Sequence, residues 1–179
     1  MSRVRIVGGA WKRRFVTFHD APGLRPTPDA VRETLFNWLG QDLTGLACLD
    51  LFAGSGVLGF EAASRGAAQV TLVERDPRVF ALLRENAAAL GASRLELIRA
   101  DALKFLPRAS RRYDLLFLDP PYHEGWIERV ESRLPDVLAP DARIYAEAEH
   151  AVERIGAWET VRRGQAGQVY YHLLEALQP

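Results

Sequence analysis

From residue 46 onward, short apolar runs alternate with segments that carry apolar residues at helical spacing. The apolar runs predict strands at residues 46–52, 69–74, 94–99, 113–118 and 143–148. Helices are predicted between them at residues 56–64, 77–90, 102–106 and 126–138, the last ended by Pro140. Two further strands, 158–163 and 169–177, form a predicted hairpin around residues 164–167. This order predicts an α/β fold with a doubly wound, mostly parallel sheet, whose ligands bind beyond the carboxyl ends of the strands.

The first forty residues predict a basic β-hairpin. Residues 3–7 and 14–18 have the pattern of short strands, and the turn between them contains Gly8 and Gly9. This part of the chain carries seven basic and three acidic residues, whereas residues 41–179 carry 16 basic and 20 acidic ones. The zero net charge of the whole chain therefore hides a positive head on a mildly negative body, which indicates contact with a polyanion.

The segment after the hairpin predicts an extended stretch and then a helix. Residues 24–28 are expected to be extended, because a residue that precedes proline is kept out of the helical region. Thr27 is the predicted N-cap of a helix at residues 29–39, with Pro28 at its first position. We therefore expect one domain over residues 1–179, in which residues 1–23 form an appendage and residues 24–179 the core.

Length and composition narrow the class of protein. The chain has 179 residues, 48% of them hydrophobic and 26% charged, which suits one folded domain and excludes wholesale disorder. The apolar runs are strand-sized, so no membrane partner is expected. The single cysteine cannot form an internal disulfide, and the N-terminus lacks the apolar run of a secretory signal. These features predict a cytoplasmic protein.

A glycine-rich turn follows the first strand of the predicted sheet. Gly54, Gly56 and Gly59 satisfy the pattern G-x-G-x-x-G between a strand and a helix, and Glu74 ends the next strand. Glycines in such a turn allow a close approach to a nucleotide, and the carboxylate binds ribose hydroxyls. Any strand–helix unit needs a tight turn here, so the pattern alone leaves both a dinucleotide site and a purely structural turn open.

Two acidic residues favour a cationic nucleotide over NAD. Asp50 precedes the glycines at the end of the first strand, where its charge would repel a pyrophosphate but attract the sulfonium and ammonium of S-adenosylmethionine. Asp101, after the third strand, offers a carboxylate or an adjacent backbone amide to an adenine edge. The alternative for Asp101 is a simple helix N-cap. Glu74 would then bind the ribose 2′- and 3′-hydroxyls.

The tetrapeptide Asp119-Pro120-Pro121-Tyr122 directly follows the most apolar strand. Its prolines fix the backbone and remove two N–H donors, which leaves carbonyl acceptors pointing into the site. These acceptors and Asp119 suit the two N–H bonds of a planar amino group, and Tyr122 can stack on the attached ring. Such a corner would favour methyl transfer to an exocyclic amine by positioning and electrostatics, with the proton lost to Asp119 or water. The alternative is an Asp-Pro turn without chemistry.

Together, residues 49–56, Glu74, Asp101 and residues 119–122 resemble the class I S-adenosylmethionine-dependent methyltransferases with a D/N-P-P-Y/F signature. Residues 5–9, 24–27, 31–39, 50–59 and 64–67 further resemble the RsmD family of bacterial 16S rRNA (guanine-N2)-methyltransferases. The resemblance covers nearly the whole chain and is weakest after residue 150. It implies a Rossmann-like seven-stranded sheet with an antiparallel last strand and the N-terminal hairpin.

The resemblance also implies the ligands and the site. S-adenosylmethionine would be the cofactor and S-adenosylhomocysteine the product, and a monomer would act on 16S rRNA in 30S subunits or their assembly intermediates. The implied cofactor-binding residues are Arg25, Thr27, Asp50, Phe52, Ala53, Gly54, Ser55, Gly56, Glu74, Arg75, Asp101, Ala102 and Asp119. The implied catalytic residues are Asp119, Pro120, Pro121 and Tyr122. The residues expected to bind RNA are Arg3, Arg5, Trp11, Lys12, Arg13 and Arg14, whose alternative is a solvated charged edge.

Other interpretations remain open at this point. The same signature would serve adenine N6 in DNA or RNA, or a protein glutamine amide, since each presents a planar NH2 group. The glycine pattern would also serve an NAD(P)-dependent oxidoreductase, and a non-catalytic RNA-binding module would keep the fold as a scaffold. The four histidines have no metal-binding spacing, so no metal is expected. His123, Glu124 and Trp126 follow the signature and could line the mouth of the substrate site, but the favoured interpretation places Trp126 in the core and the other two towards solvent.

Overall fold

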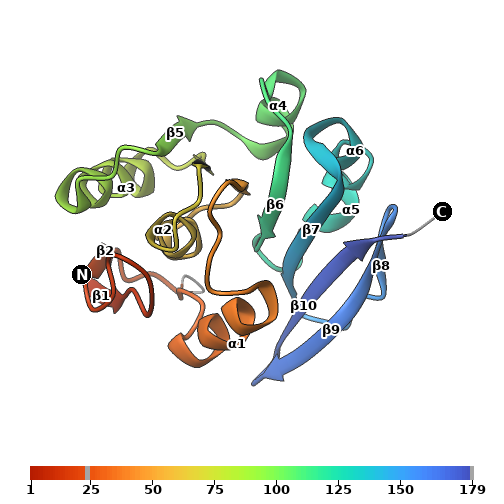
Figure 1. Cartoon of the computed structure of the whole chain (residues 1–179), viewed down its shortest axis with the longest axis horizontal. Helices are drawn as coiled ribbons and strands as arrows, with labels where there is room; N and C mark the ends of the chain where they lie inside the picture. Colours follow the sequence, from red (N-terminus) through yellow and green to blue (C-terminus); the bar gives the residue numbers. More distant parts are fainter. Residues whose placement is uncertain (23–24, 178–179) are drawn as a thin grey trace.

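Figure 1 shows the computed structural model of the protein, which describes residues 1–22 and 25–177. One large sheet runs through it, with the strand order β5-β4-β3-β6-β7-β10-β9-β8. The strands are β3 (Ala47–Asp50), β4 (Gln69–Glu74), β5 (Leu95–Arg99), β6 (Tyr113–Leu118), β7 (Leu138–Ala148), β8 (Arg154–Ile155), β9 (Trp158–Ala166) and β10 (Val169–Ala176). Strands β3 to β7 are parallel to one another, and β10 is antiparallel to both β7 and β9.

The doubly wound, mostly parallel sheet with an antiparallel last strand is confirmed. The sheet differs from the expected seven strands by the two-residue strand β8, which pairs with the start of β9 across a turn at Gly156. Gly156 has a φ of 56°, a conformation that glycine adopts at little cost. Two residues are too few for an alternating pattern, which is why the sequence did not predict this strand.

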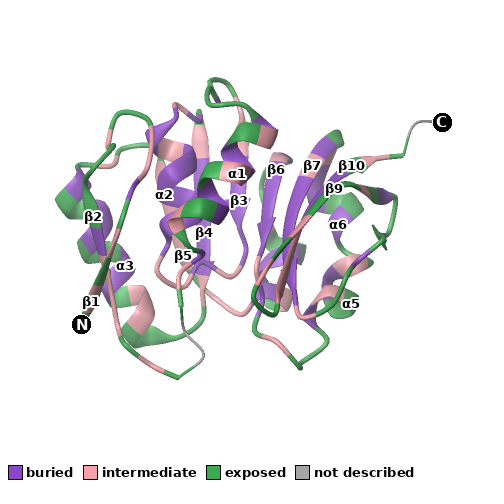
Figure 2. Ribbon diagram, turned by 90° about the horizontal axis from the view of Figure 1, so that it is seen from below, coloured by how far each residue is buried: buried purple, intermediate pink, exposed green. Residues whose placement is uncertain are grey.

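Helices cover both faces of the sheet. The helices α1 (Asp29–Leu39), α2 (Val57–Ser64) and α3 (Pro77–Leu90) share one buried apolar cluster with the sheet. The opposite cluster contains α4 (Ala102–Phe105), the 3-10 helix η1 (Leu106–Arg108), α5 (Trp126–Glu131) and α6 (Leu134–Val137). Figure 2 shows the buried positions on the strands and on the helix sides that face them. Burial on both faces explains the continuous apolar runs of the central strands.

The prediction of one helix over residues 126–138 is wrong. Helix α5 ends at Glu131, α6 is a separate single turn, and strand β7 already begins at Leu138. Pro140 therefore lies within β7 and does not end a helix. The pairing of β6 with β7 shifts register between Tyr113 and Leu115, so residues 139–142 have no partner in that ladder. Pro140 fits this irregularity because it has no N–H to donate.

The predicted N-terminal hairpin is confirmed as a separate two-stranded sheet of β1 (Ser2–Arg5) and β2 (Phe15–Phe18). Its connection packs on α2, where the backbone N–H of Ala10 donates to the Ser64 carbonyl at 2.7 Å. Gly9 has a φ of 75°, and a Cβ at this position would collide with that carbonyl. The glycine is thus required by close packing. The expected boundary between appendage and core, at residues 23 and 24, lies outside the described residues.

Candidate functional site

Four neighbouring parallel strands end at the same edge of the sheet, and each end carries a carboxylate. Asp50 ends β3, Glu74 ends β4, Asp119 directly follows β6, and Glu147 is the second-last residue of β7. Asp50 is paired with Phe117, two residues before Asp119, which fixes these two strand ends side by side. The topology therefore brings together predicted residues that are separated by up to 69 positions in the sequence.

The glycine turn is held by carboxylates on both sides. Gly54 and Gly56 have positive φ angles of 55° and 82°, a backbone conformation that residues other than glycine rarely adopt. The N–H of Gly54 donates to Glu74 Oε1 at 3.0 Å, and the N–H of Gly59 donates to Asp50 Oδ2 at 3.1 Å. Both carboxylates thus orient the loop that the sequence predicts to bind a nucleotide.

Asp50 is buried beneath this turn. Burial raises the pKa of its carboxyl to about 7, and the nearby charges of Glu74 and Glu147 act in the same direction, while the hydrogen bond from Gly59 opposes them. A positive ligand at this edge would favour the ionised carboxylate. The position therefore suits a sulfonium or an ammonium better than a pyrophosphate.

Glu74 is fixed by two backbone donors. Besides Gly54, the N–H of Asp76 donates to its second oxygen at 2.8 Å. The side chain is half-buried and remains open to solvent at the sheet edge. Among the other predicted residues of this loop, Phe52, Gly54 and Ser55 are half-buried, and Ala53 and Gly56 are buried.

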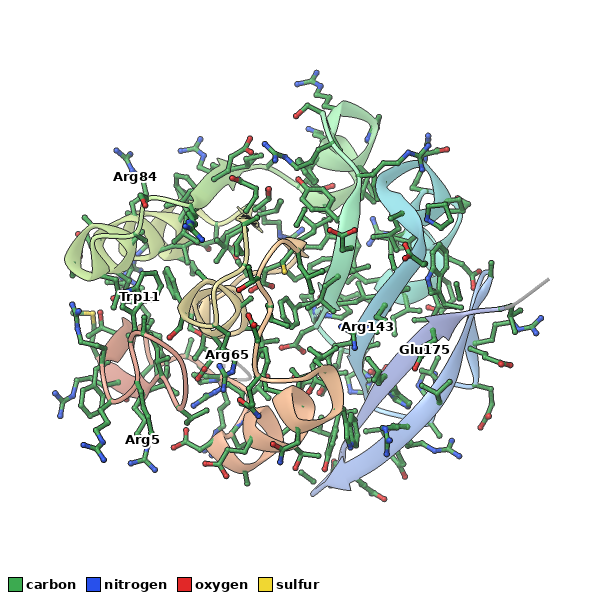
Figure 3. The ribbon with its side chains drawn as sticks, viewed as in Figure 1. Arg5, Trp11, Arg65, Arg84, Arg143 and Glu175 are labelled. Carbon is green, nitrogen blue, oxygen red and sulfur yellow. The ribbon has the colours of Figure 1, made fainter. Side chains whose placement is uncertain are left out.

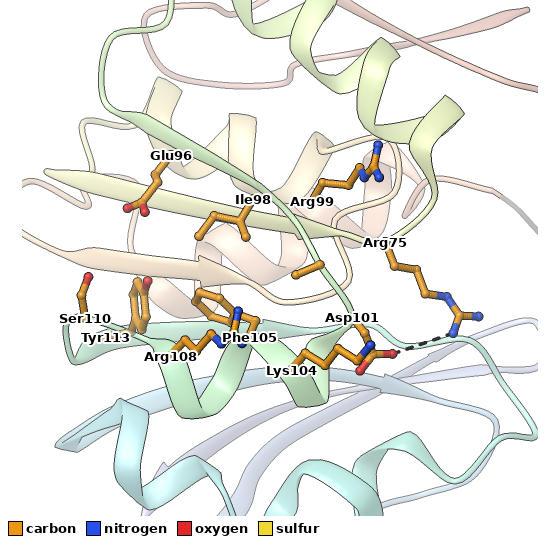
Figure 4. A pocket seen from close by; sticks show the side chains of 11 residues that line it. Arg75, Glu96, Ile98, Arg99, Asp101, Lys104, Phe105, Arg108, Ser110 and Tyr113 are labelled. Atoms are coloured by element: carbon orange, nitrogen blue, oxygen red, sulfur yellow. Dashed lines mark ion pairs between the residues drawn. The ribbon is translucent and has the colours of Figure 1, made fainter.

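A cavity of about 500 Å³ opens beside β5 and α4. Its lining includes two predicted cofactor residues, Arg75 and Asp101, and three further cations (Figure 4): Arg99, Lys104 and Arg108. Asp101 is the N-cap of α4, because its Oδ1 accepts the N–H of Leu103 at 2.9 Å. Its Oδ2 lies 3.9 Å from the Arg75 guanidinium. The capping interpretation thus holds, and the second oxygen still faces the cavity; Ala102 is buried at the start of α4.

The Asp-Pro-Pro-Tyr corner lies at the same edge. Asp119 is half-buried and Pro120 buried, whereas Pro121 is exposed and Tyr122 half-buried. Burial raises the pKa of Asp119 well above its usual value, and the charges of Glu147 and Asp50 raise it further. The pKa of Tyr122 is raised by burial and by the charges of Asp119, Glu147 and Glu149. The corner thus combines a half-buried carboxyl with an accessible outer rim.

The prediction of Thr27 as an N-cap is wrong. Pro28 occupies the N-cap position of α1, and that helix start has no side-chain cap. The Thr27 hydroxyl is buried and donates instead to Glu147 Oε2 at 2.5 Å. Arg25, the other predicted residue of this segment, is exposed.

Glu147 is the residue of this edge that sequence reasoning missed. It is 5% exposed, and its carboxylate accepts a hydrogen bond from the Thr27 hydroxyl and another, at 3.0 Å, from the Tyr145 hydroxyl. Burial raises the pKa of Glu147, against the effect of these two hydrogen bonds. A glutamate near the end of an otherwise apolar strand was the signal that could have identified it.

The basic residues predicted to bind RNA lie on the hairpin but differ in availability (Figure 3). Lys12 and Arg13 are exposed. Arg5 is paired with Asp29 at 2.9 Å, Arg14 donates to the Ala89 carbonyl at 2.8 Å, and Arg3 lies 4.2 Å from the centre of the Phe15 ring. Trp11 is half-buried and packs against the core, so only part of its side chain is open to an RNA.

Trp126 belongs to the core, as expected. It is 3% exposed and meets the Phe52 ring edge-on, with 5.2 Å between the ring centres. The Arg129 guanidinium covers the ring at 3.8 Å. His123 and Glu124 are exposed, also as expected. Phe52 therefore connects the glycine turn to the packing behind the Asp-Pro-Pro-Tyr corner.

Two further observations concern ions and membranes. Within residues 1–22 and 25–177, we find no group of three or more His, Cys, Asp or Glu side chains that is arranged to hold a metal ion. In the part of the chain that the structure describes, we find no helix with the length and apolar character needed to cross a membrane.

The sheet order, the antiparallel strand β10 beside β7 and the carboxylate-lined glycine edge define the class I methyltransferase fold. Residues 4–175 match the family model described as "Conserved hypothetical protein 95". The chain belongs to this family, the RsmD family that its motifs resemble.

Relatives and solved structures agree with this family. "Ribosomal RNA small subunit methyltransferase D" of Escherichia coli K12 is 43% identical, over 97% of this chain and 90% of that protein. The protein of the same name from Haemophilus influenzae is 41% identical, over 96% of this chain and 93% of that protein. The structure "Putative methyltransferase yhhF from Escherichia coli" is 41% identical with a TM-score of 0.88, and the match covers 99% of this chain and 100% of that one.

Proposed function

We propose that this protein transfers a methyl group from S-adenosylmethionine to the exocyclic N2 amine of a guanine in 16S rRNA. The observation that carries the proposal is the position of Asp119 and its two prolines beside Asp50 and the glycine turn, at one sheet edge. The names of the relatives support ribosomal RNA of the small subunit as the substrate. A monomer would act in the cytoplasm on 30S subunits or their assembly intermediates.

The residues of the edge fit S-adenosylmethionine. Glu74, oriented by two backbone N–H groups, would accept the ribose hydroxyls. Arg75 and Asp101 at the mouth of the cavity would flank the adenine. Asp50 and Asp119 would face the positively charged methionine end, which favours the ionised form of both carboxyls. The cofactor supplies an electrophilic methyl group on a sulfonium.

The Asp-Pro-Pro-Tyr corner would prepare the amine for attack. Acceptors at Asp119 and at the backbone carbonyls would hold both N–H bonds out of the ring plane, which frees the nitrogen lone pair towards the methyl carbon. Bound S-adenosylmethionine would supply the methyl carbon to the nitrogen and would leave as S-adenosylhomocysteine, with the electron pair of the former carbon–sulfur bond on sulfur. The extra proton on nitrogen then leaves to Asp119 or to water. Tyr122, half-buried at the rim, would stack on the base.

The hairpin would hold the RNA. Lys12 and Arg13 are exposed on the connection between β1 and β2, and both suit phosphate contacts. Such contacts position an RNA without reading its sequence, so the choice of guanine would depend on the shape of the ribosomal particle.

Methyl transfer from labelled S-adenosylmethionine to 30S subunits, followed by nucleoside analysis, tests the proposal. N2-methylguanosine is the expected product. N6-methyladenosine would assign the corner to adenine, and the absence of any methylated nucleoside would overturn the RNA activity. A thermal-shift comparison tests the cofactor independently: stabilisation by S-adenosylhomocysteine is expected, whereas stabilisation by NADH alone would favour an oxidoreductase.

A further inference from the structure

Glu147 connects two parts of the chain that are 120 residues apart. One of its carboxylate oxygens accepts the hydroxyl of Thr27 at 2.5 Å and the hydroxyl of Tyr145 at 3.0 Å. Thr27 and Glu147 are 3% and 5% exposed, so both hydrogen bonds are shielded from water. A buried hydrogen bond to a charged acceptor contributes more than an exposed one, and losing one partner leaves the other unsatisfied.

Thr27 is also held from its other side. Its carbonyl accepts a hydrogen bond at 2.8 Å from Arg32, a fully buried residue of α1. The same guanidinium donates to the Arg5 carbonyl of the hairpin and lies 3.4 Å from the Glu61 carboxylate of α2. The segment at residues 25–28 is therefore fastened to the helix layer through its backbone and to the strand edge through Glu147.

The group around Glu147 is acidic and crowded. In addition to burial, the charge of Glu147 raises the pKa of Asp50 on β3 and of Asp119 after β6, and also that of the phenols of Tyr122 and Tyr145. The second oxygen of Glu147 has no hydrogen bond to the described residues. A negative charge at this position repels the neighbouring carboxylates in the free protein and attracts a positive ligand.

We propose that Glu147 is a positioning residue of the methyl-transfer site, which anchors the Thr27 segment over the cofactor beside Asp119 and adds negative charge opposite the methionine end. This inference rests on the proposed function, because it assumes that the cofactor binds at this edge. Glu147 acts through Thr27 and Asp119.

The experiment measures S-adenosylmethionine affinity by calorimetry across a pH series, and needs no RNA. Glu147→Gln keeps an oxygen that accepts both hydroxyls but removes the charge. We expect about a tenfold weaker affinity, with the pH dependence moved to lower pH because Asp119 and Asp50 lose a repelling neighbour. The matched control is Glu175→Gln, the same change at an exposed residue of β10, which should behave as the wild type (Figure 3).

Thr27→Val removes the hydroxyl of this hydrogen bond and Glu147→Leu removes its acceptor, so these two changes make a double-mutant cycle for the anchor. If Glu147 acts through Thr27, the double variant should bind little worse than the weaker single variant. The inference would be overturned if the losses of affinity in the two single variants multiplied in the double variant. A Glu147→Gln variant with the wild-type affinity and pH profile would overturn it as well. A cooperative unfolding transition shows that a variant is folded. If a variant with a larger change at Glu147 fails to fold, the affinity and pH profile of Glu147→Gln still test the inference. A wild-type protein that binds S-adenosylmethionine but methylates no RNA would refute the proposed substrate and leave this test intact.

Discussion

The N–H of Gly54 donates to the carboxylate of Glu74 at 3.0 Å, so the glycine turn and the acid that follows it by 20 residues are in direct contact. The second oxygen of that carboxylate accepts the N–H of Asp76 at 2.8 Å. Two backbone donors thus orient the carboxylate of the proposed ribose site, which reduces the ordering cost of binding.

Glu74→Ala should weaken the binding of S-adenosylhomocysteine by about 2 kcal/mol, or roughly 30-fold. The substitution removes the ribose acceptor and leaves the N–H of Gly54 without its partner. Calorimetry gives the dissociation constant, and Glu85→Ala, at an exposed position of α3, is the control. An unchanged dissociation constant would remove Glu74 from the cofactor site.

Asp119→Ala should sharply reduce methyl transfer while cofactor binding persists. Removing one preorganised polar group from a reaction centre reduces turnover by about 100-fold or more. Single-turnover methylation of 30S subunits and calorimetry with S-adenosylhomocysteine separate the two effects. Turnover equal to that of the wild type would show that Asp119 takes no part in the reaction.

Neutralising Lys12 and Arg13 together to Gln should raise KM for the ribosomal particle and leave kcat nearly unchanged. Each lost phosphate contact makes the plot of log affinity against log salt concentration less steep, here by about 1.5 in slope for two contacts. These residues are chosen because Arg14 already donates to the Ala89 carbonyl. Arg84→Gln on the exposed side of α3 is the control (Figure 3). If neither KM nor the salt slope moves, the hairpin does not contact phosphate.

Cofactor affinity should increase as the pH rises through about 7, the raised pKa of Asp50. A positive ligand favours the carboxylate, so below this pKa binding must release a proton and is weaker, whereas above it the carboxylate is already present. Asp50→Asn should reduce the dependence. Calorimetry in two buffers of different ionisation enthalpy counts the protons released on binding. If binding at pH 6 releases no proton, Asp50 does not become ionised when the cofactor binds.

Much of the fold could be predicted from local pattern. Helix α1 at residues 29–39, helix α3 at 77–90 and strands β4 and β6 have the predicted bounds, because apolar periodicity, Pro77 and the terminal glycines mark their ends. The region of Pro140 was misread. Its place in β7 depends on a register shift against Tyr113, a pairing that the local sequence does not show.

The site divides in the same way. Asp50, Gly54, Glu74 and Asp119 were predictable, since each sits at a strand end or turn that the pattern locates. The hydrogen bond from Thr27 to Glu147 was not predictable, because it joins residues that are 120 positions apart in the sequence. The Thr27 hydroxyl makes this bond in place of capping the helix that follows it. The local sequence also does not show that Trp11 packs partly against the core.

A crystal structure with S-adenosylhomocysteine bound tests the central claim most directly, that the corner at residues 119–122 faces the methyl donor. The account predicts ribose hydroxyls on Glu74 and the sulfur pointing towards Asp119 and Tyr122, with open space for a base between them. A sulfur atom directed away from this corner, or a corner closed by the chain's own side chains around the ligand, would contradict it.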